Sequence, residues 1–403
     1  MTPPMRAGSS TPRQEPPLRI ACVGAGPAGL YFAVLAKLRD PRNEVTVYER
    51  SAAGRADGWG VTFGPDLLRR LHASDGESAR EIENAAFRWR HQFVCIRGKR
   101  VPYDNVVEIC NLNRPHIVAI LASRARALGV RIEYEAEITS RAQLPDADVI
   151  VAADGAGSRM REESGLFGTT TRVTPDKYIW LGTDKSFGTF SYHFTPTSHG
   201  WIWASSYGMR SELSTFVVHC GAATWAGLGF DTMTTADGLA LIGDLFRDEL
   251  TGHRLMGQLT DEADAHWRSF RTVANKRWQD GTVALIGDSA HTTHFSAGLG
   301  TTLAIEDAIA LAESLGRHAS VGRSLREYER RRRAQIRCHQ AQARRSGRWF
   351  TDISRYIDQE PARFATLLHA RRSALQPLLP PIAYYHLRQA RRRVAPIVKA
   401  AIR

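Results

Sequence analysis

The chain has 403 residues, of which 43% are hydrophobic, so it can form a large core and is not a disordered protein. No apolar run approaches the roughly 20 residues that a membrane-spanning helix requires, and we expect no membrane partner. The first 17 residues contain five prolines and no apolar signal segment, which predicts a cytoplasmic protein. The five cysteines are scattered without C-x-x-C spacing, and the histidines show no ligand spacing with carboxylates, so we expect neither disulfides nor a metal.

The net charge of +13 is concentrated at the C-terminal end of the chain. Residues 317–403 hold 21 Arg and Lys against 5 Asp and Glu, so the rest of the chain is close to neutral. Such a region is typical of a solvated helix face, a surface for an acidic partner, or a site for an anionic small molecule. The remaining sequence shows no nucleic-acid-binding signature, and we expect no nucleic-acid partner.

The first 50 residues predict the start of a nucleotide-binding domain. Residues 19–24 form an apolar run that ends in glycine, which is typical of a buried parallel strand. Residues 27–38 have helical character, and residues 44–49 form the next apolar run. Together they make a strand–helix–strand unit.

The later segments alternate between strand and helix patterns. Residues 85–110 predict a hairpin with its turn at Gly98, and the aromatic, β-branched section 176–220 predicts an antiparallel sheet. Other periodic segments predict strands at 131–135, 146–153 and 283–288, and helices at 115–128, at 234–249 and from about 302 to the end.

This order of elements predicts an α/β fold in which a Rossmann-like domain is interrupted by a β-rich substrate domain and followed by a helical C-terminal region. We assign residues 1–17 to a disordered lead, 85–110 and 171–274 to the β-rich domain, and 346–403 to the basic helical region. The discontinuous nucleotide-binding domain takes residues 18–84, 111–170 and 275–345.

The first motif lies between the first strand and the first helix and has the spacing G-x-G-x-x-G. Its first glycine permits a tight turn, the second lets a pyrophosphate approach the backbone, and the third allows the helix to pack closely on the strand. Glu49, 25 positions after the first glycine, ends the next strand, where a carboxylate binds ribose hydroxyls. The predicted cofactor-binding residues here are Gly24, Gly26, Pro27, Ala28, Gly29, Glu49 and Arg50.

Two more motifs follow buried strands farther along the chain. One is Asp154-Gly155, and the other is Gly287-Asp288, which continues into a glycine-rich segment. The candidate cofactor-binding residues in that segment are Gly298, Gly300 and Thr301.

Taken together, the three motifs resemble those of the flavoprotein aromatic hydroxylases of the para-hydroxybenzoate hydroxylase type, over residues 18–345. The resemblance implies an FAD-binding domain of the glutathione-reductase type with non-covalent FAD. It also implies that NAD(P)H reduces the flavin, and that O₂ adds at its C4a position to form a hydroperoxide that hydroxylates an aromatic ring. Arg114 matches a family arginine that contacts the flavin phosphate or ribityl chain.

Four further segments are similar to a smaller group within this family: residues 58–61, 177–183, 214–218 and 294–298. The group contains salicylyl-CoA 5-hydroxylase, 2-aminobenzoyl-CoA monooxygenase and the violacein-pathway hydroxylase. The sequence departs from the family where His294 and Phe295 replace the usual prolines. It departs from the CoA-type members where Thr302 replaces a lysine.

The chemistry requires a dry cavity that holds the substrate ring, and a polar group near it. We expect His294 and Phe295 to be the catalytic-site residues, with histidine favoured because a base that takes the ring proton would speed the reaction of a phenol or aniline. The predicted substrate residues are Tyr192, Trp201, Trp203, His219 and Phe230.

The preferred substrate is a hydroxy- or aminobenzoyl-CoA, and the alternative is an indole-derived or carrier-bound aromatic intermediate of secondary metabolism. A non-oxygenating reductase or a halogenase is a remote alternative, since Trp201-Ile-Trp203-Ala lacks the ending of the halogenase motif. A degenerate FAD-binding protein without turnover is disfavoured by the intact motifs. We expect a monomer or a homodimer. The arginines at 371–372 and 391–393 are hypothetical contacts for CoA phosphates or an acidic carrier protein.

Overall fold

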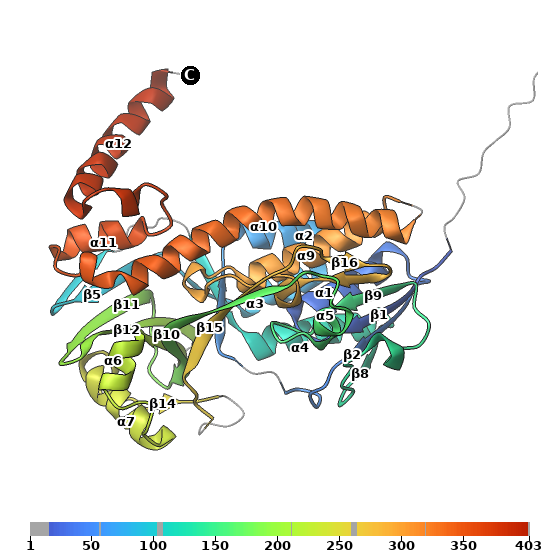
Figure 1. The fold of residues 1–403 in the computed structure, drawn as a ribbon, viewed down its shortest axis with the longest axis horizontal. Coiled ribbons are helices and arrows are strands. Elements are labelled where there is room, and N and C mark those ends of the chain that lie inside the picture. The colour runs from blue at the N-terminus through green and yellow to red at the C-terminus, as the bar shows by residue number, and fades with distance from the viewer. Residues whose placement is uncertain are drawn as a thin grey trace, which may run out of the picture.

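The computed structural model describes most of the chain, in two lobes that lie side by side (Figure 1). The predicted disordered lead falls almost entirely on residues 1–15, which lie outside the described part. The described residues are 16–55, 58–102, 108–210, 212–258, 264–318 and 320–401.

Within these residues, a six-stranded sheet forms the nucleotide-binding lobe, in the order β16-β17-β9-β1-β2-β8. Strand β1 pairs in parallel with both β2 and β9, and only the edge strand β16 is antiparallel to its neighbour. Every residue of β9 is buried, because helices and loops cover this central strand on both faces. The strands are β1 (Arg19–Val23), β2 (Glu44–Tyr48), β8 (Arg131–Glu133), β9 (Val149–Ala152), β16 (Gln279–Asp280) and β17 (Val283–Leu285).

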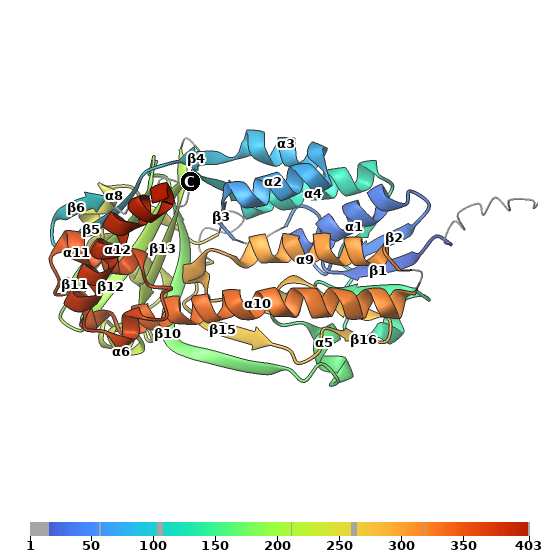
Figure 2. The same cartoon turned by 90° about the horizontal axis from the view of Figure 1, so that it is seen from above.

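Helix α1 is the central helix of this lobe and packs against both α4 and α9. It begins at Pro27, a residue that suits the first helical position because it lacks the N–H that would be unpaired there. Helices α9 and α10 run side by side along the lobe (Figure 2). The helices are α1 (Pro27–Arg39), α2 (Pro65–Ser74), α3 (Gly76–Ala85), α4 (Arg114–Ala127), α5 (Arg159–Ser164), α9 (Gly300–Leu315) and α10 (Val321–Thr351).

A large, mostly antiparallel sheet forms the second lobe, in the order β14-β10-β13-β12-β11-β5-β6, with β15 also paired to β10. The hairpin predicted at Gly98 is present: β5 and β6 pair across it, and Gly98 has a φ of +68°. The strands are β5 (Gln92–Ile96), β6 (Lys99–Pro102), β10 (Thr170–Thr183), β11 (Phe190–Thr197), β12 (Gly200–Arg210), β13 (Leu213–Cys220), β14 (Leu255–Met256) and β15 (Arg268–Ala274).

The two faces of this sheet have different coverings. Successive side chains of a strand point to opposite faces, so Tyr178 and Ile179 belong to different layers. The face that carries Ile179 and Phe216 forms an apolar cluster with three short helices, namely α6 (Ala222–Gly227), α7 (Thr235–Leu245) and α8 (Arg247–Leu250). The face that carries Tyr178 lies toward the nucleotide-binding lobe, and the candidate active site is built on it.

A three-stranded sheet, in the order β3-β7-β4, lies between the lobes. Its strands are β3 (Gly60–Phe63), β4 (Phe87–Trp89) and β7 (Ile109–Asn113). Strand β7 leads directly into α4, and the Asn113 side chain caps that helix by accepting a hydrogen bond from the His116 N–H at 2.7 Å. Arg114 is thereby fixed at the start of the helix.

Helix α10 joins the two lobes. It runs without a break through residue 345, where the sequence placed a domain boundary, and its far end reaches the large sheet (Figure 2). There Phe350 stacks on Trp203 of β12. Helix α11 (Pro361–His369) packs beside α10, and Phe364 of α11 meets Phe194 of the sheet edge-on with ring centroids 4.9 Å apart. Helix α12 (Pro381–Ala401) projects away from the body (Figure 1).

A buried ion network anchors the turn that carries Gly287 and Asp288. Asp307 of α9, which is 0% exposed, accepts hydrogen bonds from the Gly287 N–H (3.0 Å), His291 Nε2 (2.7 Å) and Arg332 Nε (2.7 Å). Burial alone would raise the pKa of this carboxyl, but His291 and Arg332 outweigh it and hold the pKa below its usual value. The carboxylate therefore ties α9, α10 and the turn together.

We expect Asp307→Asn to lower the free energy of unfolding by about 3–5 kcal/mol, because it removes the buried carboxylate that binds both Arg332 and His291 and leaves Arg332 only its ion pair with Glu306. Urea unfolding of the FAD-free protein measures this. The lowered pKa means that the carboxylate stabilises the fold above about pH 4 and that this contribution is lost as the pH falls through the folded-state pKa. The difference between wild type and variant should therefore shrink on acidification. Asp148→Asn, at the exposed pair with Arg19, is the matched control and should change little.

Candidate active site

The G-x-G-x-x-G turn shows why each glycine is needed. Gly24 has a φ of +105°, and a Cβ there would lie 2.5 Å from the Ala153 carbonyl oxygen. A Cβ on Gly29 would collide with the carbonyl oxygen of Gly24. At Gly26, by contrast, a Cβ would meet no atom within 4 Å. The first and third glycines are therefore required by the protein itself, whereas the space above the second is open at the N-terminus of α1.

Glu49 lies at the end of β2 beside this helix terminus. One carboxylate oxygen accepts the Ala25 N–H at 2.8 Å, and the other accepts the Ser51 N–H at 2.9 Å. The carboxylate is thus held beside the glycine turn, where it can receive further hydrogen bonds from a ribose. The neighbouring Arg50 is exposed.

The Asp154-Gly155 segment places an unsatisfied carboxylate oxygen at the same edge of the sheet. Asp154 Oδ2 accepts the Met160 N–H at 3.2 Å, but Oδ1 is buried and has no hydrogen-bond partner in the described part of the chain. Burial raises the pKa of this carboxyl. Arg161 of the same segment donates to the Ser289 carbonyl at 3.0 Å, so the second and third motifs are directly joined.

Asp288 lies in the short turn Gly287–Ser289 that follows β17. Its side chain is solvent-exposed, yet burial among surrounding protein atoms raises the pKa of the carboxyl, against the charges of His291 and Arg114. Gly298 follows in the left-handed conformation (φ +60°), and Gly300 and Thr301 open α9. Four features fit an FAD molecule laid across these motifs: the open space above Gly26, the Glu49 carboxylate beside it, the Asp154 oxygen without a partner among the described residues, and the exposed Asp288 carboxylate.

We expect Gly26→Val to abolish FAD binding while leaving the FAD-free fold intact, because the added side chain enters only the open space where the pyrophosphate would lie. Flavin absorbance after reconstitution and the melting temperature of the FAD-free protein measure the two effects. Gly243→Val, at another glycine with open space around it, is the control and should bind FAD normally. A Gly26→Val protein that retains bound FAD would contradict this placement.

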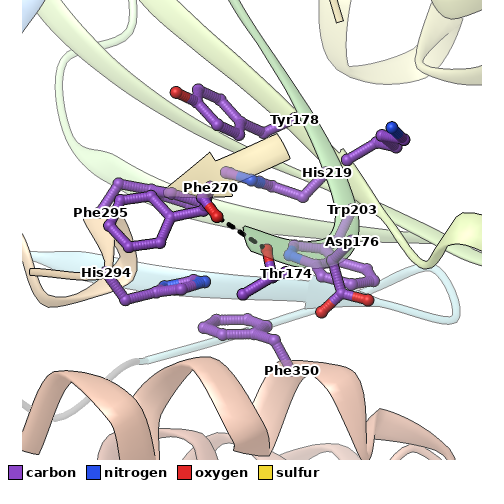
Figure 3. Close-up of a pocket in the computed structure, with 10 residues that line it drawn as sticks. Thr174, Asp176, Tyr178, Trp203, His219, Phe270, His294, Phe295 and Phe350 are labelled. Carbon is purple, nitrogen blue, oxygen red and sulfur yellow. Dashed lines mark hydrogen bonds between the residues drawn. The ribbon is translucent and has the colours of Figure 1, made fainter. Parts of the chain in front are cut away.

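An aromatic pocket lies between the large sheet, the 294–298 loop and α10 (Figure 3). His219 stacks on Phe295 with centroids 4.5 Å apart and an interplanar angle of 6°, and Tyr178 contacts the same ring at 4.8 Å. The cavity volume is about 20 Å³, room for about one water, whereas benzene occupies an engineered cavity of about 150 Å³. The pocket must therefore open to admit a ring. It is lined by Thr174, Asp176, Lys177, Tyr178, Trp203, His219, Phe270, His294, Phe295 and Phe350.

His294 and His219 bring neutral imidazoles to this pocket. Burial, assisted by the charge of Arg371, lowers the pKa of His294 to about 4. Burial likewise holds the pKa of His219 well below its usual value, and its Nδ1 has no hydrogen-bond partner among the described residues. A base with a pKa of about 4 removes a proton weakly at neutral pH, so these groups suit hydrogen bonding to a substrate better than proton abstraction.

The structure separates the five residues predicted to bind substrate. Trp203 and His219 line the pocket, whereas Trp201 packs in the cluster formed with α11. Tyr192 belongs to that cluster and accepts a hydrogen bond from Arg371. Phe230 must be corrected: it lies in the cluster on the opposite face of the sheet, against Trp267 with ring centroids 4.8 Å apart. Its ring is therefore separated from the pocket by the sheet.

Arg371 and Arg372 also require a correction, since they are not available for an external phosphate. Arg371 is 7% exposed and donates to Ser346 Oγ (3.0 Å), Tyr192 Oη (3.3 Å) and the Ser296 carbonyl (2.9 Å). Arg372 donates to the Ala297 carbonyl at 2.6 Å. Both side chains therefore donate hydrogen bonds to backbone carbonyls of the 294–298 loop. Their place in a basic cluster of the sequence gave no signal of this role.

We expect Arg371→Met to lower the free energy of unfolding by roughly 2–4 kcal/mol, because buried acceptors lose a charged donor. FAD should remain bound. Because the 294–298 loop would move, however, a larger share of NAD(P)H oxidation should yield H₂O₂. Peroxide and product measured together give this share. Arg391→Ala, at an exposed position of α12, is the control, and equal coupling in both variants would argue against a positioning role.

Three comparisons bear on the family. The family model described as "FAD binding domain" matches residues 18–342. The chain belongs to the FAD-dependent aromatic monooxygenases of the para-hydroxybenzoate hydroxylase type. Such enzymes use FAD, NAD(P)H and O₂, and the residues described above would hold the FAD.

Two curated relatives and one solved structure define the similarity. Salicyloyl-CoA 5-hydroxylase from a Streptomyces species is 36% identical over 86% of this chain and 68% of that protein. The 3-hydroxy-4-methyl-anthranilyl aryl-carrier-protein 5-monooxygenase of Streptosporangium sibiricum is 32% identical over 83% of this chain and 90% of that protein. The fold matches 2-methyl-3-hydroxypyridine-5-carboxylic acid oxygenase with a TM-score of 0.71, at 22% identity over 89% of this chain and 98% of the other.

No helix in the structurally described part of the chain is long and apolar enough to cross a bilayer. No group of three or more His, Cys, Asp or Glu residues there is placed to hold a metal ion.

Proposed function

We propose that this monooxygenase hydroxylates the ring of a hydroxy- or aminobenzoyl thioester, of the salicylyl-CoA type. The observation that carries the proposal is an aromatic pocket with two neutral histidines, His219 of β13 and His294 of the 294–298 loop. This loop leads into Gly298 and Gly300, which are predicted to bind FAD. The names of the two relatives, one acting on a CoA ester and one on a carrier-bound ester, support the thioester.

The pocket walls suit an aromatic ring that carries one polar substituent. Phe295, Phe350 and Trp203 offer ring faces, and the stacked pair Trp203–Phe350, with centroids 5.5 Å apart, excludes water from one side. His219 Nδ1 is buried beside the Phe295 ring and has no hydrogen-bond partner among the described residues. A phenol hydroxyl or an aniline amino group that bonded to it would remove the cost of leaving it unpaired.

Each of these residues has a defined task in the proposed reaction. The reduced FAD, when bound, supplies the activation of O₂. The chain supplies a dry enclosure and a fixed ring orientation, and both are needed because water entering the site would divert the reaction to H₂O₂. Phe295 and the neutral His294 would contact the ring from the 294–298 loop, and His219 would orient the ring substituent.

A second candidate substrate is an indole- or tryptophan-derived aromatic. It is supported by protodeoxyviolaceinate monooxygenase of Chromobacterium violaceum, which is 28% identical over 93% of this chain and 100% of that protein. The small cavity at the pocket favours a single ring over a fused pigment precursor, because less opening is then needed.

The test is NADPH and NADH oxidation by the FAD-loaded protein with salicylyl-CoA, anthraniloyl-CoA, their free acids and tryptophan. We expect a CoA ester to accelerate oxidation at least tenfold over the free acid and to gain 16 mass units, the mass of one oxygen atom. Phe295→Ala, which opens the pocket to water, should keep FAD bound but increase the share of H₂O₂. Stimulation by tryptophan-type compounds alone would favour the second candidate.

A further inference from the structure

A second, larger cavity adjoins the aromatic pocket on the side of α10. Its volume is about 380 Å³, and it shares Thr174 and His294 with the aromatic pocket. His294 therefore stands between an inner compartment and an outer one. The outer cavity is lined by Thr174, Thr272, Thr292, Thr293, His294, Gln340, Arg344, Gly347, Arg348, Thr351 and Asp352.

The outer cavity is lined mainly by polar side chains, whereas the inner pocket is lined mainly by aromatic side chains. Four threonines of the strands and of the segment before His294 line it, together with the amide of Gln340. Thr272 and Thr293 form no side-chain hydrogen bond within the described residues, so their hydroxyls are free for a ligand. Such a wall suits a chain of amide groups better than a second ring.

Two arginines of α10, Arg344 and Arg348, line this cavity. Arg344 and Arg348 are four residues apart and so share a helix face. Neither side chain forms a hydrogen bond or an ion pair in the part of the chain that the structure describes. Two other arginines of this helix do have acidic partners: Arg330 pairs with Glu327, and Arg333 pairs with Glu329.

Acidic side chains nearby only partly offset this positive charge. Asp352 lies in the cavity wall, and Asp176 in the adjoining pocket accepts a hydrogen bond from Thr351 Oγ1 at 2.5 Å. Two unpaired guanidinium groups beside a polar cavity are suited to binding a phosphate.

His294, which lines both cavities, packs against a glycine of α10. A Cβ on Gly347 of α10 would lie 2.8 Å from Cδ2 of His294, so the imidazole packs directly on the helix backbone. Gly347 leaves room for this ring between Arg344 and Arg348 on the same stretch of helix. A group that enters from the outer cavity would meet His294 first and the aromatic pocket next.

We propose that the outer cavity binds the phosphopantetheine arm of the substrate. The phosphate lies at Arg344 and Arg348, the amides of the arm lie along the threonines, and the aryl group passes His294 into the aromatic pocket. CoA and carrier proteins share this arm, so the site accepts either source. The inference rests on the thioester function proposed above and adds to it a location and an anion-binding pair.

The test compares salicylyl-CoA with salicylyl-pantetheine, which has the same arm without phosphate, in the FAD-loaded Arg344→Ala/Arg348→Ala double variant. We expect the KM for the CoA ester to rise at least tenfold, and the KM values for the pantetheine ester and for NADPH to stay within twofold of wild type. Arg337→Ala, an exposed arginine on the same helix outside the cavity, is the matched control and should change none of them. A carrier protein loaded with the same aryl group tests the second source of the arm and should show the same loss.

An unchanged KM for the CoA ester in the double variant would overturn the site while leaving the thioester function intact. A rise in the KM for NADPH instead would assign the arginines to the nicotinamide cofactor and also overturn it. If no thioester stimulates the wild type, the proposed function fails, and calorimetry with 4′-phosphopantetheine decides the site separately. Binding to wild-type holoenzyme that the double variant loses would support the site, and no binding to wild type would overturn it.

Discussion

The structure depends on one buried carboxylate, Asp307. A charge removed from water is tolerated only when oppositely charged and hydrogen-bonding groups surround it, and Asp307 has Arg332, His291 and the Gly287 N–H. Asp307 itself is on α9, Arg332 is on α10, and Gly287 and His291 belong to the segment after β17. The requirement to satisfy one carboxylate thus places three separate segments around the flavin cleft.

Helix α10 connects this buried ion network to the second lobe. Arg332 anchors it to α9, and farther along Gly347 and Phe350 form walls of the two cavities. The C-terminal part then holds the 294–298 loop through Arg371 and Arg372. Residues that look like a basic tail in the sequence therefore support the centre of the molecule.

The chemistry of the site follows from its burial. Burial keeps both pocket histidines neutral, so they bring hydrogen-bonding capacity without adding charge to a compartment that must exclude water. The polar outer cavity can remain hydrated without admitting water to the ring, because His294 stands between the two. A substrate with an aromatic end and a long polar arm matches this division.

The sequence by itself determined the cofactor motifs and most elements. The roles of Gly24 and Gly29 follow from contacts within one short turn, and alternating apolar residues reveal strands and helices locally. Only the tertiary structure decided which face of the large sheet meets the flavin lobe. Phe230 and Trp203 have equal aromatic character, yet helices α6–α8 cover one and the pocket includes the other. Arg371 and Arg348 likewise belong to one basic region, but packing of α11 buries the first and leaves the second exposed. Such differences depend on contacts between segments far apart in the chain, which no local pattern encodes.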